Sequence, residues 1–494
     1  MSIDNNDIKI KEASKSKMRF DNENSKLAKF FGFKKFNTTL KKEIIGGIST
    51  LLAMIYILSV EPEILKYAPS VDGGAKLDGK GVFLATAIIA FAATFVMGMV
   101  SNIPVALAPS MGVNAMFTYS VAMKGIGYQG ALFATMISGV LFCIISISNV
   151  RKMLIKALPK SLHIAIGLGI GFFIAYVGVA NIGWVKIGDE NTEISGLPVA
   201  TLNNFKVFYP AIIIGTLVLL GAVVLHFKKF VAPIAVMMLA GFIIAVILAN
   251  VLPNNDVIKN SFGTAKFNSN WEYKSMFNGF VNNIKSTFNN AGNLAIWKSP
   301  TMYISIFVFT ILTFFDATGT LTSVMVESNK NSPYEREIPK SAMIIDGGST
   351  IFSSFMAISH NAVYAESCVG ISQGARTGFS SIVTSIGLLL SIALSPLFTM
   401  LPSCISGAAT VFIGIIMISN ITEIEWKKPE ISLASFFIIL FMIITYNIAV
   451  GIGLGLITYT IGCLATKKVK EVHPIIWVLD VVFIAYFIAF AFIQ

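Results

Sequence analysis

The apolar residues of this chain fall into blocks of 17–25 residues, separated by short segments that carry charges, Gly or Pro. Blocks of that length match a hydrocarbon core roughly 30 Å thick, because an α-helix rises about 1.5 Å per residue. Of the 494 residues, 55% are apolar and 13% charged, whereas soluble domains are about 25% charged. The sequence therefore predicts an all-α polytopic membrane protein and excludes soluble enzymes and nucleic-acid-binding proteins.

The blocks divide into two sets of seven, with an Asn- and Ser-rich stretch at 253–298 between them. The first set is expected at 44–66, 82–101, 104–123, 129–148, 162–182, 208–226 and 231–252. The second is expected at 301–326, 341–356, 357–375, 378–398, 403–420, 431–448 and 449–466. An odd number of spans per set gives the second copy the opposite orientation, so the sequence predicts a 7+7 inverted-repeat transporter.

The expected domains follow from this division and from the placement of charge. They are a basic tail (1–41), a first repeat (42–252), an extracytoplasmic loop (253–299), a second repeat (300–466) and a C-terminal segment (467–494). Eleven of the 37 Lys and Arg precede residue 43, and within this tail Lys26–Phe36 is read either as a surface helix or as a frayed end. Basic residues mark cytoplasmic loops and attract acidic lipids, so we expect a cytoplasmic N-terminus, with Arg151–Lys160 inside and the acidic 185–207 loop outside. The last apolar block, 474–493, either spans the membrane or lies against the core, and Asp480 favours the second.

The third member of each set departs from an uninterrupted helix. Residues 101–114 carry Pro104, Pro109 and Gly112, and residues 357–378 carry several polar side chains. Proline breaks the helical hydrogen-bond ladder, and irregular backbone at membrane depth requires a covering of protein or a water-filled cavity. Broken segments at corresponding places in two repeats indicate the binding site of a transporter.

Few carboxylates lie within the expected spans, and two of them are read as functional. Asp316 lies in mid-span, and Glu366 lies where the second broken segment should turn into a half-helix. A charge at the bilayer centre is costly unless it is paired, hydrated or protonated. Glu61 precedes Pro62 near a span end and is read as interfacial, whereas Asp346 is read as a helix cap or a partner of Lys340.

The half-helices predict the chemistry of the ligand. A half-helix N-terminus presents free N–H groups, and the position that mirrors Glu366 in the first repeat is Gly112–Asn114. Amide donors beside carboxylate and carboxamide acceptors suit a small planar ligand with donors and acceptors on its edge. His360 lies six residues before Glu366 in the broken segment and is kept as a secondary candidate for contact with substrate.

Several segments carry a family resemblance. GGISTLLAMIYILSVEPEIL, ATAIIAFAATFVMGMVSNIPVALAPSMGVNAMFTYSV, FFDATGTLTSV and YAESCVGISQGARTGFSSIVTSIGLLLSIALSPL resemble the AzgA-like adenine/guanine/hypoxanthine permeases of the nucleobase–cation symporter-2 family, in the same order from about residue 42 to 470. The resemblance implies a core domain of spans 1–4 and 8–11, a gate domain of spans 5–7 and 12–14, and a strand plus half-helix in spans 3 and 10. It also implies a homodimer.

The resemblance implies purine contacts at named positions of this chain. They come from Tyr364-Ala365-Glu366 in the tenth span, Asn114 in the third and Asp316 in the eighth. This chain departs from the family at four places: Thr313 replaces a second acid, Ser110 replaces a Gly, Ala357–Asn361 replaces a Gly- and Thr-rich run, and Glu61 replaces an Asn. Either His360 or Glu61 is a candidate to compensate for the acid missing at position 313.

The sequence thus predicts a plasma-membrane permease of a bacterium and no enzyme, with no catalytic residue, metal or cofactor. The expected cargo is hypoxanthine or guanine, with adenine as a further candidate, carried with a proton that Asp316 or Glu366 binds. The alternative is the same fold carrying uracil, xanthine or a small anion. A carboxylate at position 366 would repel an anion, which counts against that cargo.

Overall fold

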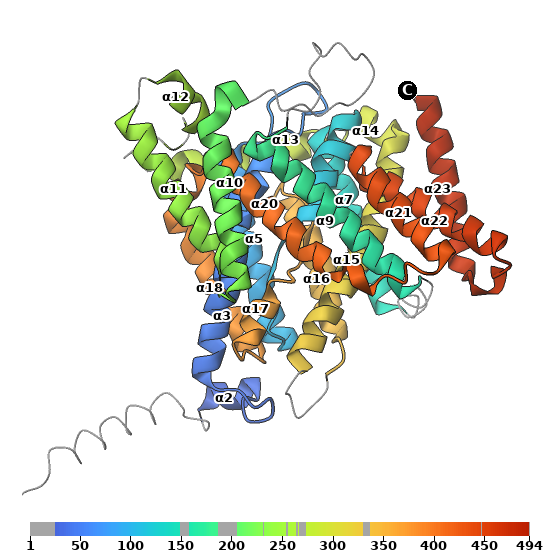
Figure 1. Ribbon diagram of the computed structural model, residues 1–494, viewed down its shortest axis with the longest axis horizontal. Coiled ribbons are helices and arrows are strands. Elements are labelled where there is room, and N and C mark those ends of the chain that lie inside the picture. The colour runs from blue at the N-terminus through green and yellow to red at the C-terminus, as the bar shows by residue number, and fades with distance from the viewer. Residues whose placement is uncertain are drawn as a thin grey trace, which may run out of the picture.

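The computed structural model describes residues 25–148, 158–185, 205–230, 232–252, 255–262, 265, 273–329, 336–445 and 447–493, and Figure 1 shows a bundle of helices. Ten helices of this described part are long and apolar enough to cross a membrane. The chain is therefore a multi-pass membrane protein. The expected tail up to residue 24, most of the basic 151–160 loop and most of the acidic 185–207 loop lie outside the described residues.

Helices occupy most of the expected spans. In the first half they are α3 (Leu40–Met54), α4 (Ile57–Leu65), α5 (Gly79–Val96), α7 (Gly127–Ile147), α9 (Lys160–Ile182), α10 (Phe205–Phe227) and α11 (Pro233–Val251). In the second half they are α15 (Pro300–Asn329), α16 (Lys340–Phe355), α18 (Gly378–Leu390), α19 (Ser395–Thr399), α20 (Ser403–Ile418), α21 (Pro429–Ile444) and α22 (Ile448–Ala465). Their contacts form two groups: α3, α4, α5 and α7 pack with α15, α16 and α18, while α9, α10 and α11 pack with α20, α21 and α22.

The third and tenth expected spans are broken, as their prolines and polar residues predict. The first contains strand β1 (Leu107–Pro109) followed by helix α6 (Met111–Ala115), and the second contains strand β2 (Asn361–Val363) followed by helix α17 (Ser367–Ser372). The two strands pair antiparallel with Ala108 opposite Ala362. This pairing satisfies the backbone N–H and C=O groups that would otherwise be unpaired inside the bundle.

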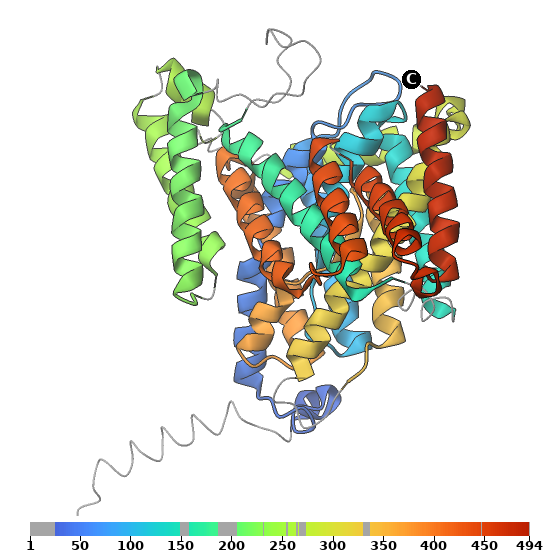
Figure 2. The same ribbon diagram turned by 45° about the vertical axis from the view of Figure 1, so that its right-hand side comes forward.

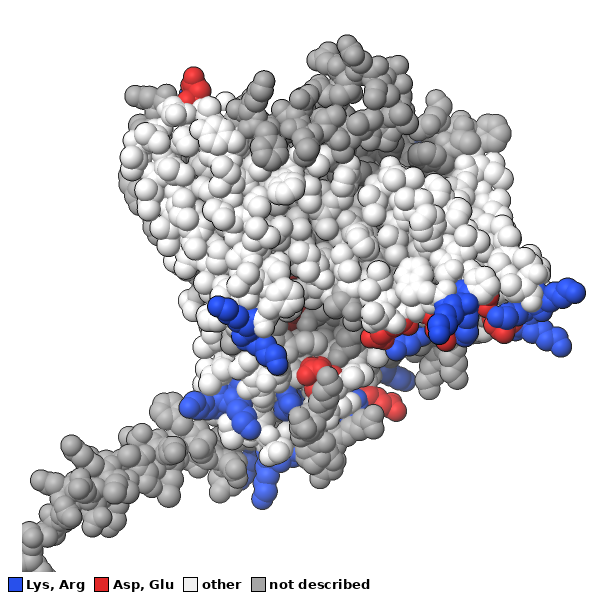
Figure 3. All heavy atoms as spheres, in the orientation of Figure 1, with Lys and Arg blue, Asp and Glu red and all other residues white. Residues whose placement is uncertain are grey.

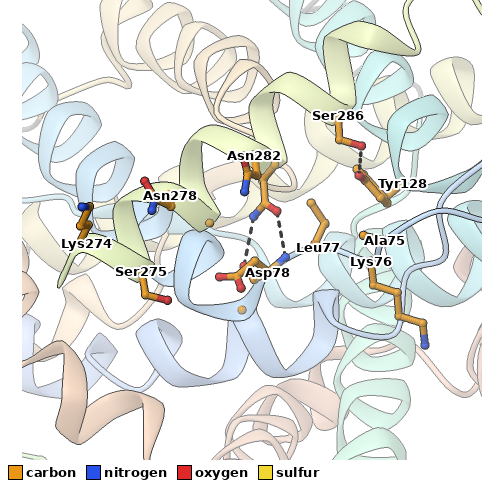
Figure 4. A pocket seen from close by; sticks show the side chains of 13 residues that line it. Ala75, Lys76, Leu77, Asp78, Tyr128, Lys274, Ser275, Asn278, Asn282 and Ser286 are labelled. Atoms are coloured by element: carbon orange, nitrogen blue, oxygen red, sulfur yellow. Dashed lines mark hydrogen bonds between the residues drawn. The ribbon is translucent and has the colours of Figure 1, made fainter. Parts of the chain in front are cut away.

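The 253–298 stretch is more ordered than the loop that its composition predicts. It holds α12 (Asp256–Phe262), α13 (Tyr273–Asn289) and α14 (Leu294–Lys298). Helix α13 packs on α5, where the Asp78 N–H donates to Asn283 Oδ1 (2.9 Å) and Asn283 Nδ2 donates to the Asp78 carbonyl (3.1 Å). These contacts border a hollow of about 980 Å³ (Figure 4). Apolar residues recur at helical spacing among the Asn residues, and this spacing predicts a helix that the Asn-rich composition alone does not.

Helix α2 (Lys26–Phe31) lies at the end of the bundle opposite α12 and α13 (Figure 1). Phe31 and Phe33 pack against Phe379 with ring centroids 5.6 and 5.9 Å apart. The expected helix is therefore present over Lys26–Phe31 and packed on the bundle, while the rest of the segment to Phe36 forms turns. The Arg336 guanidinium lies 4.1 Å from the Phe36 ring centre. Burial lowers the pKa of Arg336 to about 10, which leaves it charged at neutral pH. Figure 3 shows Lys and Arg gathered along this lower rim, below a broad face almost without charge.

Helix α23 (Pro474–Ile493) holds the last apolar block and packs along α22 (Figure 2). Asp480 is buried in that interface, where Thr460 Oγ1 donates to its Oδ2 at 2.5 Å. The acid therefore faces the bundle, an arrangement that suits a spanning helix as well as a helix that lies against the core.

A buried carboxylate caps the start of α18. The backbone N–H groups of Arg376 (2.8 Å), Thr377 (3.1 Å) and Ser380 (3.1 Å) all donate to Glu43 of α3. An anion at a helix N-terminus satisfies orphan donors and the helix dipole. We expect Glu43→Gln to lower stability by about 1–3 kcal/mol, because its amide group would face N–H donors. Thermal unfolding of the purified protein measures this loss.

The matched control is Glu63→Gln, which removes an ion pair with the half-exposed Lys66 and should change stability by only about 0–1 kcal/mol. Equal melting temperatures for the two variants would contradict the capping role of Glu43.

Candidate functional site

The candidate site is built around the paired strands. The Ser110 N–H donates to the His360 carbonyl and the Tyr364 N–H donates to the Ala106 carbonyl, each at 2.9 Å, so the pairing continues beyond both strands. Because the strands are antiparallel, α6 and α17 start from opposite ends of this small sheet. The side chains at these two starts come from opposite halves of the chain and are held by one shared sheet.

Glu366 occupies the position just before α17, as its sequence predicts. It is half-buried, and its neighbour Ala365 is exposed, so a solute can reach this part of the chain. The Tyr56 hydroxyl, between α3 and α4, donates to Glu366 Oε1 at 2.6 Å. A carboxylate has about four lone-pair directions, so both oxygens keep acceptor capacity. Tyr56 therefore orients the carboxylate and leaves it able to accept from a ligand.

Asp316 is tied to the start of α6. The Ser110 hydroxyl donates to Asp316 Oδ2 at 2.9 Å, and Tyr364 OH donates to the Pro109 carbonyl at 2.5 Å. Ser110, rather than Gly112–Asn114, is the N-cap of α6 and mirrors Glu366. The prediction misplaced this start because the helix begins at Met111, directly after the Pro109 strand end. Asp316 and Tyr364 are thereby linked through Pro109 and Ser110.

Asn114 points away from this pair and toward α4. Its Nδ2 donates to Glu61 Oε2, and its Oδ1 contacts the Ser359 hydroxyl, which also lies 2.7 Å from Glu61 Oε1. All three side chains are fully buried. The interfacial interpretation of Glu61 is therefore wrong: the residue lies in the middle of α4, where the two broken segments cover it.

The role predicted for Asp346 is also wrong. Helix α16 begins at Lys340, so Asp346 lies in its second turn, and it neither caps the helix nor pairs with Lys340. It is fully buried, and in the described part of the chain neither carboxylate oxygen has a hydrogen-bond partner. His360 is fully buried too, with its Nδ1 2.9 Å from Thr350 Oγ1. His360 is thus enclosed in this conformation, unlike the accessible Glu366 and Ala365.

The remaining predicted positions differ in accessibility. Thr313 is buried one turn before Asp316, and its hydroxyl has no partner within the described residues. Gly112 faces α9, where an added Cβ would lie 2.6 Å from Ile170 Cγ2. Gly112 therefore allows α6 to approach α9 closely, and does not line an open surface. Glu366 and Ala365 are the accessible members of the predicted set, together with the half-buried Asp316.

The arrangement offers mainly acceptors to a ligand. Glu366 and Asp316 present carboxylate oxygens from α17 and α15, and a carboxylate accepts from N–H donors. Within the described residues, no group of three His, Cys, Asp or Glu side chains could hold a metal ion. Carboxylate oxygens held in this way can accept hydrogen bonds from a small solute with N–H groups on its edge.

Sequence reasoning gave no site contact to Tyr56, Ser110 and Ser359, and it named Glu61 only as a candidate to compensate for the acid missing at position 313. Tyr56 lies in an apolar span, where an aromatic residue is ordinary, so no signal marks it. Ser110, Ser359 and Glu61 all stand at departures from the family pattern. These departures from the family pattern are thus the signal from which a shared site could have been predicted.

Comparison with known proteins places the chain among transporters. The profile of a permease family matches residues 41–454. A guanine/hypoxanthine permease of Bacillus subtilis is 32% identical over 468 residues, which cover 93% of this chain and 99% of that protein. An adenine permease of Escherichia coli is 29% identical, over 93% of this chain and 95% of that protein.

Two solved structures share the fold. The transmembrane domain of a cyanobacterial bicarbonate transporter, BicA, aligns with a TM-score of 0.50 over 86% of this chain and 97% of that chain. SLC26A9 aligns with a TM-score of 0.55 over 93% of this chain and 70% of that chain, and each is 14% identical. These likenesses concern architecture alone and indicate a transporter fold. The family match over most of its length shows that this chain belongs to the permease family, and that it is a membrane transporter and not an enzyme.

Proposed function

We propose that this protein is a secondary-active nucleobase permease that imports oxopurines, hypoxanthine and guanine, with a proton. The observation that carries the proposal is Glu366. It is an accessible carboxylate at the start of a half-helix, held by Tyr56, in a chain similar to a guanine/hypoxanthine permease over 93% of its length. Both oxopurines carry an N1–H donor, which a carboxylate accepts, whereas neutral adenine has an acceptor at N1.

Each site residue takes a role that its contacts support. Glu366 accepts hydrogen bonds from N1–H and, in guanine, from the 2-amino group. Asp316, tied to the α6 start by Ser110, supports the site from the opposite half and is a candidate carrier of the coupling proton. Asn114 is proposed for the other edge of the ring, which it can reach only after its hydrogen bonds with Glu61 and Ser359 rearrange. The Tyr364 hydroxyl holds the Pro109 end of β1. No cofactor takes part in this mechanism.

Transport in this proposal is a movement of one helix group against the other. The group containing α3, α4, α5, α7, α15, α16 and α18 is the core domain, and the group containing α9–α11 and α20–α22 is the gate domain. Fourteen spans in a 7+7 inverted repeat, with a cytoplasmic N-terminus, fit the placement of α2 and the basic rim opposite α12 and α13. We further propose that the protein resides in the plasma membrane and forms a homodimer.

The alternative cargo is uracil, xanthine or a small anion in the same fold. The anion transporters of similar fold do not favour that cargo here, since Glu366 and Asp316 would both repel an anion that reaches them. Uracil and xanthine carry N–H donors as well, so competition experiments must separate them from hypoxanthine.

The test is uptake of radiolabelled hypoxanthine by cells that lack their own purine permeases. We expect saturable uptake, inhibition by excess guanine, and loss of accumulation when an uncoupler removes the proton gradient. One proton moving across about 100 mV supports roughly 50-fold accumulation. Expressed protein that moves no purine would overturn the cargo assignment, and accumulation insensitive to the uncoupler would overturn proton coupling. Excess uracil, xanthine or bicarbonate as competitor tests the alternatives.

A further inference from the structure

Three side chains from three separate elements close a ring inside the bundle. Glu61 belongs to α4, Asn114 to α6, and Ser359 lies just before β2. Asn114 contacts Glu61 Oε2 and Ser359 Oγ, and Ser359 Oγ contacts Glu61 Oε1 at 2.7 Å. All three side chains are fully buried. Every link of the ring is therefore a direct contact between polar atoms.

Counting hydrogens fixes the protonation state of this ring. Each of its three contacts needs one hydrogen between two heavy atoms. The Asn114 amide supplies one of them and the Ser359 hydroxyl supplies one, because a hydroxyl has a single hydrogen. With Glu61 ionised, one contact would join two acceptors with no hydrogen between them. Exchanging the amide O and N of Asn114 gives the same count, so the result does not depend on how the amide is oriented.

We propose that Glu61 carries a proton in this conformation, and that release of this proton switches the hydrogen bonding of Asn114. In the protonated ring, Glu61 donates to Ser359, Ser359 donates to Asn114 Oδ1, and Asn114 donates to Glu61. When the Glu61 proton leaves to water, the Ser359 hydroxyl turns toward Glu61 Oε1 and Asn114 Oδ1 loses its donor. Glu61 is thus a proton-binding residue that acts on cargo through Asn114. The effect on cargo rests on the proposed function, whereas the protonation of the ring does not.

The surroundings of Glu61 contain few other charges. Helix α4 packs against α5, α6, α19, α20 and β1. The titratable side chains on those elements are Lys80, which is exposed at the start of α5, and the buried Cys404 of α20. On α4 itself, Glu63 is paired with Lys66. His360, next to Ser359, bonds with Thr350, and the buried Tyr364 interacts electrostatically with Glu61. None of the residues in this set places a cation beside Glu61.

A protonated Glu61 also accounts for two departures of this chain from the family pattern, at positions 61 and 313. An acid is missing at Thr313, and an acid is present at Glu61 where the family pattern has Asn. An Asn at 61 would supply its own N–H to such a ring and could not release a proton. The exchange thus moves a titratable group from α15 to α4, where it contacts both broken segments.

Infrared spectroscopy of the purified protein tests the protonation directly. A protonated carboxylic acid has a C=O stretch that a carboxylate lacks. We expect such a band in the wild type, its loss in Glu61→Gln, and its retention in Glu63→Gln. Glutamine can donate to Ser359 and accept from Asn114, so it preserves the ring and the fold. A second variant, Ser359→Ala, should shift the same band, because the acid loses its acceptor. A spectrum that neither substitution changes would overturn the proposal.

Transport assays distinguish a failure of the proposed switch at Glu61 from a failure of the cargo assignment. In Glu61→Gln we expect exchange of internal for external hypoxanthine to persist, and the roughly 50-fold accumulation that one proton across about 100 mV supports to be lost. Proton-driven accumulation at the wild-type level in this variant would overturn the switch. A wild type that carries no purine would overturn the proposed function, while the infrared band would still decide the state of Glu61.

Discussion

Replacing Glu366 by glutamine is expected to cause a large loss of hypoxanthine and guanine uptake. The amide turns one of the two acceptors of the side chain into a donor, which would face the purine N1–H. Loss of one or two hydrogen bonds to a charged group costs about 1.5–3 kcal/mol each, or at least roughly tenfold in apparent affinity. Uptake kinetics in cells without other purine permeases measure the change.

The same substitution is expected to improve the fit of adenine. Glutamine can donate to N1 of adenine and accept from its 6-amino group. Adenine should therefore compete better against residual hypoxanthine uptake in the variant than in the wild type. Glu366→Asp keeps the charge and should retain part of the activity, and Glu63→Gln, at a carboxylate paired with Lys66, should be silent. Normal oxopurine uptake by Glu366→Gln would remove Glu366 from the site.

Replacing Gly378 by alanine is expected to cause a large loss of stability. An added Cβ would lie 1.9 Å from the Gly98 carbonyl oxygen and 2.7 Å from its carbon, so two backbones would have to separate. Gly378 begins α18, and Asn102 Oδ1 accepts from its N–H at 2.8 Å. Overpacking costs about 1–3 kcal/mol of stability where side chains can adjust. Because the clash at Gly378 is with backbone atoms, we expect a loss at or above the upper end of that range.

Gly348→Ala on α16 is the matched control. No atom lies within 4 Å of a Cβ added there, so the substitution should raise helix stability by up to about 1 kcal/mol. Thermal unfolding and the yield of monodisperse protein in detergent report both effects. Equal melting temperatures for Gly378→Ala and Gly348→Ala would show that α18 and the segment at Gly98 separate without cost.

The two broken segments show how far sequence patterns reach. Prolines at 104 and 109 and the polar run from Ser359 to Glu366 predict interruptions, because no uninterrupted apolar helix can contain them. They do not say that β1 pairs with β2 or that Ala108 lies opposite Ala362. Three-residue strands carry too few side chains for a period-2 pattern to specify a partner 254 residues away, so the register depends on the surrounding helices.

Glu61 shows the same limit for the site. Its position before Pro62 and near a span end is what an interfacial residue would show, and one sequence contains no signal of what covers that end. Asn114 and Glu366 were both assigned to one ligand surface, yet Asn114 bonds with Glu61 and Ser359 while Glu366 bonds with Tyr56. Side chains that meet across hundreds of residues are brought together by packing, which local patterns do not encode.

The sequence by itself determined the membrane class, most helix positions, the two interruptions and the transporter family, because hydropathy, proline and charge act within a single segment. Only the tertiary structure decided which polar groups share a partner: Tyr56 with Glu366, Ser110 with Asp316, and Glu61 with Asn114 and Ser359. The physical reason is that a buried polar group must find its hydrogen bonds among whatever side chains the fold brings within about 3 Å. That choice is made by the packing of helices from both halves of the chain.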